Sequence, residues 1–253
     1  MLVVDQTTTA ITKTTTAAIT NAEAQALAYP VGWWISNEAV IIDPPGAFIS
    51  QDAPAGPPTS ASIDSGPSVA PGTQAKLWQH LLSWLQHNRS QRALNGLLLV
   101  VDLPALLHGT VEQRTALAHV LRTRLYEVST QLGSRLPLYV VLSKFDLLDG
   151  FDQFYGKLSA PSRERLLGFT FKLDAVDTFD AWLSEYGEHY DRLLSQLFEQ
   201  VIDQLHMQSS PEPRSRLYSL HAQLLGLRPI LLSFLRETLA SDRFTTPETQ
   251  LLR

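Results

Sequence analysis

Residues 138–146 read LYVVLSKFD, an apolar run of strand length that leads directly into Ser-Lys-Phe-Asp. Residues 39–46, AVIIDPPG, have the same form, because an apolar run ends there in an aspartate. Two further apolar runs, residues 2–5 (LVVD) and 97–102 (LLLVVD), also end in aspartate. Strands that are apolar throughout are typical of parallel sheets buried on both faces. These runs therefore predict a parallel sheet whose functional edge lies at the carboxyl ends of its strands.

Helical patterns alternate with these runs and then replace them. Leucine, valine and tryptophan recur at helical spacing in residues 77–85 and 117–132. Beyond about Ala175 the helical period is continuous, with a break at residues 211–213 (PEP) and with Pro229 as a kink or a new first turn. The order of these patterns predicts an α/β domain followed by an antiparallel helical domain.

We place the boundary between the two predicted domains at residues 173 and 174. Residues 1–173 form the α/β domain, and residues 174–253 form the all-α helical domain. Within the first domain, residues 51–74 are half Pro, Gly and Ser. Because such a segment has no periodic apolar face to offset its ordering entropy, we predict a flexible loop there.

The composition excludes several classes of function. The chain has 20 basic and 25 acidic side chains, with a net charge of −5, so it has no basic stripe for nucleic acid. It has no cysteine, which excludes disulfide frameworks and thiol catalysis, and its seven histidines are too scattered to predict a metal site. No apolar run reaches the roughly 20 residues of a membrane-spanning helix. The abrupt ends of the sequence are those expected of a piece excised from a longer chain.

Two short motifs follow predicted strands. Asp43-Pro44-Pro45-Gly46 has the form D-x-x-G, which in P-loop GTPases places the aspartate near Mg²⁺ and the glycine amide at the γ-phosphate. Ser143-Lys144-Phe145-Asp146 has the form [NT]-K-x-D, with serine first, in which the lysine stem stacks on a base and the aspartate accepts from a guanine edge. Each pattern alone is weak, and D-P-P-G is also a favourable turn. Their order at two strand ends predicts a P-loop NTPase (small GTPase)-like sheet with flanking helices.

The segment that should be the phosphate loop departs from the P-loop pattern. A working loop reads G-x-x-x-x-G-K-[ST], whereas residues 5–16 read DQTTTAITKTTT without a glycine. If Lys13 and Thr14 align with K-[ST], Thr7 and Thr12 take the glycine places, where β-branched residues resist the required backbone. The alternative is that Lys13-Thr14 is chance in a Thr-rich segment. We interpret the following residues as a vestigial nucleotide site: Lys13, Thr14, Asp43, Gly46, Ser143, Lys144 and Asp146.

Hydrolysis is not expected at this site. Ras-like enzymes orient the attacking water with a glutamine just after D-x-x-G, and this chain has Ala47 there. Pro44 and Pro45 stiffen the segment and remove two amides. The sequence therefore predicts no catalytic residue, no metal site and no bound cofactor. GTP or ATP with Mg²⁺ is the alternative ligand.

Longer stretches resemble the TssM (IcmF) family. Residues 33–43, WWISNEAVIID, followed by Gly46, and residues 136–151, LPLYVVLSKFDLLDGF, resemble blocks of that family. Residues 168–171 (GFTF) and 213–216 (PRSR) extend the resemblance, which covers residues 33–243. These motifs are long and ordered, so the resemblance is specific. The Trp33-Trp34 pair inside the first block is interpreted as core plus interface rather than as a stacking platform for bases.

The resemblance implies a cytoplasmic domain of a bacterial inner-membrane protein, a component of type VI secretion systems. It implies a TssL-like inner-membrane partner, baseplate components, and the rest of the same chain in the membrane and periplasm as contacts. Some family members have an intact phosphate loop, and this sequence departs from them at Thr7, Thr12 and Pro44-Pro45.

We therefore expect a non-catalytic scaffold that docks partners of the secretion machine. The alternative is a nucleotide-binding or nucleotide-hydrolysing switch that energises secretion. A third interpretation makes the helical part a regulatory docking site for a soluble factor. Residues 51–74 and aromatic side chains such as Trp182 are the candidate contact surfaces.

Overall fold

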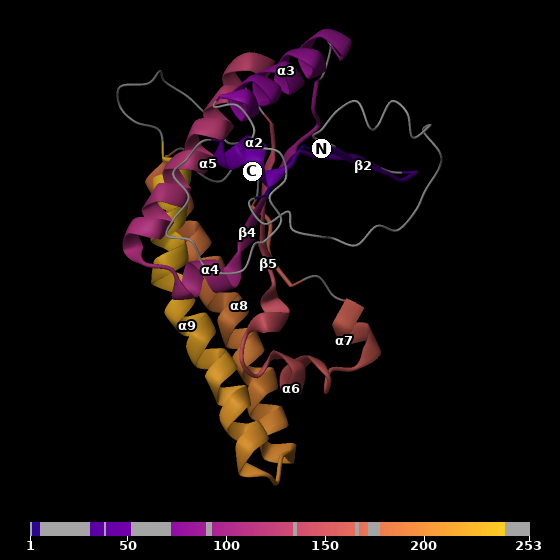
Figure 1. Ribbon diagram of the computed structural model, residues 1–253. Helices are drawn as coiled ribbons and strands as arrows, with labels where there is room; N and C mark the ends of the chain where they lie inside the picture. The colour runs from indigo at the N-terminus through magenta and orange to yellow at the C-terminus, as the bar shows by residue number, and fades with distance from the viewer. Residues whose placement is uncertain are drawn as a thin grey trace, which may run out of the picture. The chain divides into compact units, whose positions relative to one another are not determined.

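The structure is a computed structural model that describes residues 2–5, 31–37, 39–51, 72–89, 93–133, 136–164, 167–171 and 178–240 (Figure 1). The chain divides into two compact units. The first unit comprises Met1–Val101, Thr123–Val141 and Thr249–Leu252, and the second comprises Asp102–Arg122, Leu142–Glu248 and Arg253. The boundary predicted from sequence between residues 173 and 174 stays a prediction.

Five strands form one sheet in the order β2-β3-β1-β4-β5. Their bounds are β1 Leu2–Asp5, β2 Gly32–Ile35, β3 Val40–Asp43, β4 Leu97–Asp102 and β5 Leu138–Ser143. Strand β1 pairs in parallel with β3 and β4, so that Leu2 lies opposite both Ile42 and Leu97. The predicted α/β class and the four predicted strands are confirmed.

The expected all-parallel sheet is wrong at β2, which pairs antiparallel with β3. Only a short turn separates the two strands, and Ser36 N donates to Ala39 O at 2.9 Å across it. A parallel pair would need a crossover of a dozen or more residues. The turn length therefore decides the direction of this strand.

The expectation that every strand is buried on both faces is wrong for β5. In β4, Leu97, Leu99 and Val101 are all at most 5% exposed. In β5, by contrast, Tyr139 is 52% exposed and Val141 is 41% exposed. Among the described strands, β5 is the last one of the sheet.

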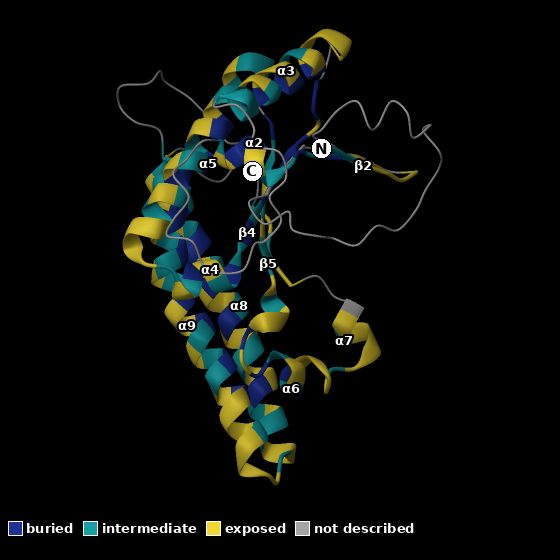
Figure 2. Cartoon of the chain, viewed as in Figure 1, coloured by how far each residue is buried: buried dark blue, intermediate teal, exposed yellow. Residues whose placement is uncertain are grey.

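The first unit packs short and long helices against this sheet. They are α2 Gly46–Ser50, α3 Thr73–Asn88 and the C-terminal part of α5 Val111–Leu132. Trp78, Leu82 and Leu85 of α3 are fully buried, and alternating buried and exposed turns of the helix are visible in Figure 2. The helices predicted from residues 77–85 and 117–132 are confirmed. The predicted loop over residues 51–74 falls mostly outside the described residues.

Side-chain hydrogen bonds tie α3 to α5. Trp78 Nε1 donates to Glu127 Oε2 at 2.7 Å, and Gln131 Nε2 donates to Ser83 Oγ at 2.9 Å. The second pair lies further toward the C-terminus than the first on both helices, so α3 and α5 run side by side in the same direction. Arg124, which is 9% exposed, donates to the same Glu127 oxygen at 2.9 Å.

The second unit is dominated by an antiparallel helical hairpin. The hairpin consists of α8 Phe179–Met207 and α9 Pro211–Leu239. The same unit also contains α4 Leu103–His108, the 3₁₀ helix η1 Phe145–Leu147, α6 Phe151–Tyr155 and α7 Ala160–Glu164. The predicted break at residues 211–213 is confirmed, because α9 begins at Pro211. Pro229 lies inside α9, which continues to Leu239, so no new helix starts there. No described helix combines the length and the apolar content that crossing a membrane requires.

Candidate functional site

The residues of the predicted nucleotide site fall into three places. Lys13 and Thr14 lie outside the described residues. Asp43 ends β3 and Gly46 begins α2, both in the first unit. Ser143 ends β5, and Lys144 and Asp146 follow it in the second unit. Each group is therefore described with its own neighbours.

The D-P-P-G segment is a turn that leads into a short helix. Phe48 N donates to Pro45 O at 2.8 Å, so Gly46 becomes the first residue of α2. Phe48 and Ile49, which are at most 2% exposed, anchor this helix in the core. Asp43 lies opposite Gly32 in the sheet, and a Cβ atom on Gly32 would approach the Asp43 Cβ to 3.2 Å. The glycine thus leaves room for the aspartate at the end of β3.

Lys144 has a left-handed backbone conformation, and its ammonium group forms an ion pair. Its φ of 60° and ψ of 35° place it in the left-handed region, where a side chain is unfavourable. Its Nζ atom donates to Asp102 Oδ2 at 2.6 Å. The Lys144 side chain is 43% exposed and the Asp102 side chain 13% exposed. This ion pair joins the residue that ends β4 to the residue that follows β5.

Asp102 is a residue of this site to which the sequence analysis assigned no role. Its other oxygen, Oδ1, accepts from Ala105 N at 3.0 Å and so caps the N-terminus of α4. Capping and pairing together engage both carboxylate oxygens. The sequence carried a signal, since an aspartate that ends an apolar strand and precedes Leu-Pro is a typical N-cap with proline in the first turn.

Phe145, the third residue of the S-K-F-D motif, points into the helical hairpin. Its ring packs edge-on against Phe151 with centroids 5.5 Å apart. It also lines a small apolar cavity whose other walls come from α6, α8 and α9. Those other lining residues are Phe154, Leu194, Leu197, Phe198, Val201, Leu220, His221 and Leu224.

The chain after the motif is docked closely on α9. Gly150 has φ of 87°, and a Cβ atom there would lie 2.0 Å from the Arg216 carbonyl oxygen. Gln223 Nε2 donates to Asp149 O at 3.1 Å. Asp146 itself is exposed in η1. The motif loop is therefore a structural contact of the hairpin as well as a candidate binding loop.

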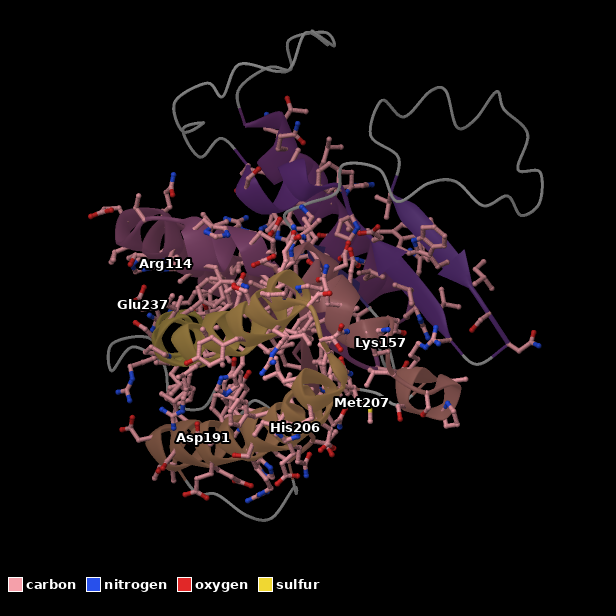
Figure 3. The ribbon with its side chains drawn as sticks, turned by 90° about the horizontal axis from the view of Figure 1, so that it is seen from below. Arg114, Lys157, Asp191, His206, Met207 and Glu237 are labelled. Carbon is pink, nitrogen blue, oxygen red and sulfur yellow. The ribbon has the colours of Figure 1, made fainter. Side chains whose placement is uncertain are left out.

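Two polar connections join α8 and α9 of the hairpin, one exposed and one buried. Arg228 of α9 donates through both Nε and Nη2 to the carboxylate of Asp191, which is labelled on α8 in Figure 3. Tyr190 Oη donates to Leu224 O at 2.7 Å, and burial raises the pKa of its hydroxyl. A Cβ atom on Gly187 would lie 3.1 Å from Arg228 Nη2, so a glycine lets the guanidinium lie against α8.

Trp182 was expected as an exposed contact residue, but it is half-buried in an aromatic cluster. Phe171 and Phe179 lie 5.4 and 5.5 Å from its ring. Phe169 stacks on His189 with centroids 5.2 Å apart. The cluster attaches residues 167–171 to α8, and it makes Trp182 a packing residue. Among the residues that the structure describes, no group of three or more potential ligands gathers to hold a metal ion.

Comparisons with known proteins agree on one kind of protein. Residues 72–253 match the family model of the IcmF-related N-terminal domain. Over 203 residues the chain is 30% identical to the type VI secretion system component TssM1 of Pseudomonas aeruginosa, a match that covers 80% of this chain. The matched part is 17% of that relative, so the chain spans a small share of its length. No solved structure matches the chain.

Proposed function

The chain belongs to the family of the IcmF-related N-terminal domain, and on that premise we propose that it is a non-catalytic docking module of a type VI secretion membrane complex. We further propose that it is a cytoplasmic domain of an inner-membrane protein. Its proposed contacts are a TssL-like membrane partner, baseplate components and the remainder of a longer chain. The sheet is proposed to be a degenerate relative of P-loop NTPases.

The observation that carries the proposal is the Lys144–Asp102 ion pair. In a nucleotide-binding [NT]-K-x-D motif, the aliphatic part of the lysine side chain stacks on the ring of the bound base. Here its ammonium group is held 2.6 Å from the Asp102 carboxylate, and Phe145 beside it lines a cavity together with residues of α6, α8 and α9. These contacts support a structural role for the motif segment.

The sequence of the predicted phosphate loop supports the same proposal. Threonine at positions 7 and 12 replaces both glycines whose backbone freedom would let the loop curl around phosphates. Pro44 and Pro45 have no N–H to donate to a γ-phosphate. These two changes leave fewer suitably placed backbone donors for a phosphate than a working nucleotide site has.

The alternative function, a GTP or ATP switch, is favoured by one observation. D-x-x-G and S-K-x-D follow β3 and β5, and a central parallel β1 precedes the Lys13-Thr14 segment. Nucleotide sites of open α/β sheets lie at the carboxyl ends of such strands. A retained site would therefore be built from the same residues.

Nucleotide binding separates the two proposals. We expect no change in thermal midpoint with millimolar GTP or ATP and Mg²⁺, whereas a ligand at 100 times its Kd would add about 2.7 kcal/mol. A fluorescent analogue provides the direct titration. Low-micromolar binding that is lost in Lys13→Ala or Asp146→Ala would overturn the docking proposal in favour of the switch.

Partner docking is tested by copurification. The 253-residue chain, tagged, is expected to retain a TssL-like membrane partner or a baseplate component from cells that express the secretion machine. A matched chain lacking residues 52–71 tests whether that segment contributes to the contact. If neither class of partner is retained, the docking function is contradicted.

A further inference from the structure

One turn of α9 is a weak point in the backbone hydrogen bonding of that helix. Pro229 has no N–H, so the carbonyl of Leu225, four residues earlier, accepts no helical bond from it. Gly226 lies in the same turn, and after proline glycine is the least favourable residue for a helix interior. A proline inside a helix is also a common site of bending. Residues 225–229 are therefore the segment at which α9 bends most easily.

Packing does not require a glycine at position 226. Within the described part of the chain, a Cβ atom on Gly226 would meet no heavy atom within 4 Å. Two other glycines of this unit differ in this respect. A Cβ atom on Gly187 would lie 3.1 Å from Arg228 Nη2, and one on Gly150 would clash with the Arg216 carbonyl oxygen. Gly226 therefore lowers the local stability of α9 without making room for a described neighbour.

The hydrogen bonds from α8 lie at the same turn. Tyr190 Oη donates to the Leu224 carbonyl at 2.7 Å. Arg228 donates from Nε and Nη2 to the carboxylate of Asp191. Two adjacent residues of α8 thus hold both ends of residues 224–228, the segment that has the weakest helical bonding of its own.

The buried face of α9 continues through this turn. Leu224, Leu227 and Leu231 are at most 5% exposed, whereas Gly226 and Pro229 are exposed. The buried side is held by apolar packing, and the exposed side carries the missing hydrogen bond. Bending at this turn would therefore open the exposed side of the helix and keep the buried leucines in place.

The two parts of α9 that meet at this turn have different contacts. In the N-terminal part, Gln223 donates to the Asp149 carbonyl of the motif loop at 3.1 Å. In the C-terminal part, Arg236 Nη1 lies 3.2 Å from Asp180 Oδ1 near the start of α8. A bend at residues 225–229 would therefore move one contact region relative to the other.

We propose that residues 225–229 are a hinge of α9 and that the bonds from Tyr190 and Asp191 are the latch that holds it closed. With the latch closed, the two parts of α9 keep the arrangement of this structure. When the latch opens, the C-terminal part swings about the hinge, and Arg236 moves relative to the motif loop. The hinge is a property of the hairpin alone, so it does not rest on the docking function proposed above.

Amide hydrogen exchange measures the opening of the hinge, because local opening exposes helical amides to solvent. In the unsubstituted 253-residue chain, we expect the amides of residues 226–233 to exchange faster than those of residues 217–224 of α9 and 192–201 of α8. Uniform protection along these segments would overturn the proposal.

Substitutions separate the hinge from the latch. Tyr190→Phe combined with Asp191→Ala removes the latch and should speed exchange of the hinge amides about tenfold, with the rest of the hairpin unchanged. Gly226→Ala combined with Pro229→Ala strengthens the helix and should slow that exchange about tenfold. Asp180→Ala breaks an ion pair away from the hinge and is the matched control, which should leave these amides unchanged. Faster exchange along the whole hairpin in the latch variant would show general destabilisation and contradict the proposal.

Spin labels test the bending itself, because the chain has no cysteine of its own. Ser215→Cys and Ser233→Cys place two labels at exposed sites on the same face of α9, about 27 Å apart along the helix axis. Double electron–electron resonance should give a broad distance distribution, broader still without the latch and narrow when Gly226 and Pro229 are both alanine. Circular dichroism checks that each variant is folded. Identical distributions in all three backgrounds would rule out the hinge.

Discussion

At the scale of single residues, the S-K-F-D segment of this chain acts as a structural connector. Lys144 binds Asp102, Phe145 lines a cavity with residues of α8 and α9, and Gly150 lies against the backbone of α9. Of the motif residues that could contact a nucleotide, Lys144 is paired with a carboxylate of the protein itself. Their contributions to stability can be separated by substitution.

Asp102 has two roles that two substitutions distinguish. Asp102→Asn keeps a good N-cap for α4 but loses the ion pair, which we expect to cost about 0.5 kcal/mol because Lys144 is partly exposed. Asp102→Ala loses the cap as well and should cost about 1.5 kcal/mol. Urea denaturation measures both. Equal effects of the two variants would show that the cap contributes nothing.

Substitution of Gly150 and of Gly133 by alanine separates the cost of a left-handed backbone from the cost of a steric clash. Both have positive φ, 87° and 59°, but only a Cβ on Gly150 would clash with a backbone atom. Gly133→Ala should cost about 1 kcal/mol from the left-handed backbone alone. Gly150→Ala should cost about 3 kcal/mol or more, since α9 must also shift. Thermal and urea denaturation that find equal costs would contradict the docking of the motif loop on α9.

At the scale of elements, the two units use different kinds of contact. In the first unit, α3 and α5 are joined by hydrogen bonds from Trp78 and Gln131 across a mostly apolar interface. In the second unit, α9 buries a face made mostly of leucine, whereas the buried face of α8 combines leucine, tyrosine, glycine and valine. Polar bonds from Tyr190 and Arg228 set the register of the hairpin within this apolar contact.

The buried tyrosines give the hairpin a defined pH dependence. Burial raises the pKa of Tyr186 and of Tyr190 above the value of about 10 in an unfolded chain. The unfolded state then loses its protons first, so the free energy of unfolding should fall as pH rises above about 10. It should be constant with respect to these groups below that pH.

Urea denaturation between pH about 8 and about 10.5 measures this loss of stability. Tyr186→Phe removes one titrating group and should flatten the dependence while it leaves the Tyr190 bond intact. Tyr190→Phe should flatten it too, and should also cost about 1 kcal/mol at neutral pH through the lost bond to Leu224. An unchanged slope in both variants would contradict the assignment.

At the scale of the whole molecule, the net charge of −5 sets the kind of partner that the chain can bind. Phosphate-backbone binding depends on clustered lysine and arginine, and the chain carries more acidic than basic side chains.

The same charge predicts no nucleic-acid binding. Electrophoretic mobility of a labelled DNA duplex should not change with micromolar protein at about 0.15 M salt. A basic variant in which Glu188 and Glu199, both exposed on α8, become lysine serves as a comparison. A shift by the unsubstituted chain that weakens with added salt would contradict the prediction.

The sequence predicted the features that depend on short stretches of chain. Apolar runs of strand length predicted β1, β3, β4 and β5, and helical periodicity with a Pro-Glu-Pro break predicted the α8–α9 hairpin, because local composition and spacing suffice for such elements. The long ordered motifs of residues 33–43 and 136–151 identified the family. The D-x-x-G and S-K-x-D motifs were also visible, since each begins at the last residue of a strand.

Only the tertiary structure decided what those motif residues touch. That Lys144 reaches Asp102, 42 positions earlier, depends on the neighbouring positions of β4 and β5, which no local pattern encodes. The half-exposed face of β5 was likewise seen only in the folded structure. A side chain's chemistry is carried by its residue type, but its partner is set by which strand ends packing brings together.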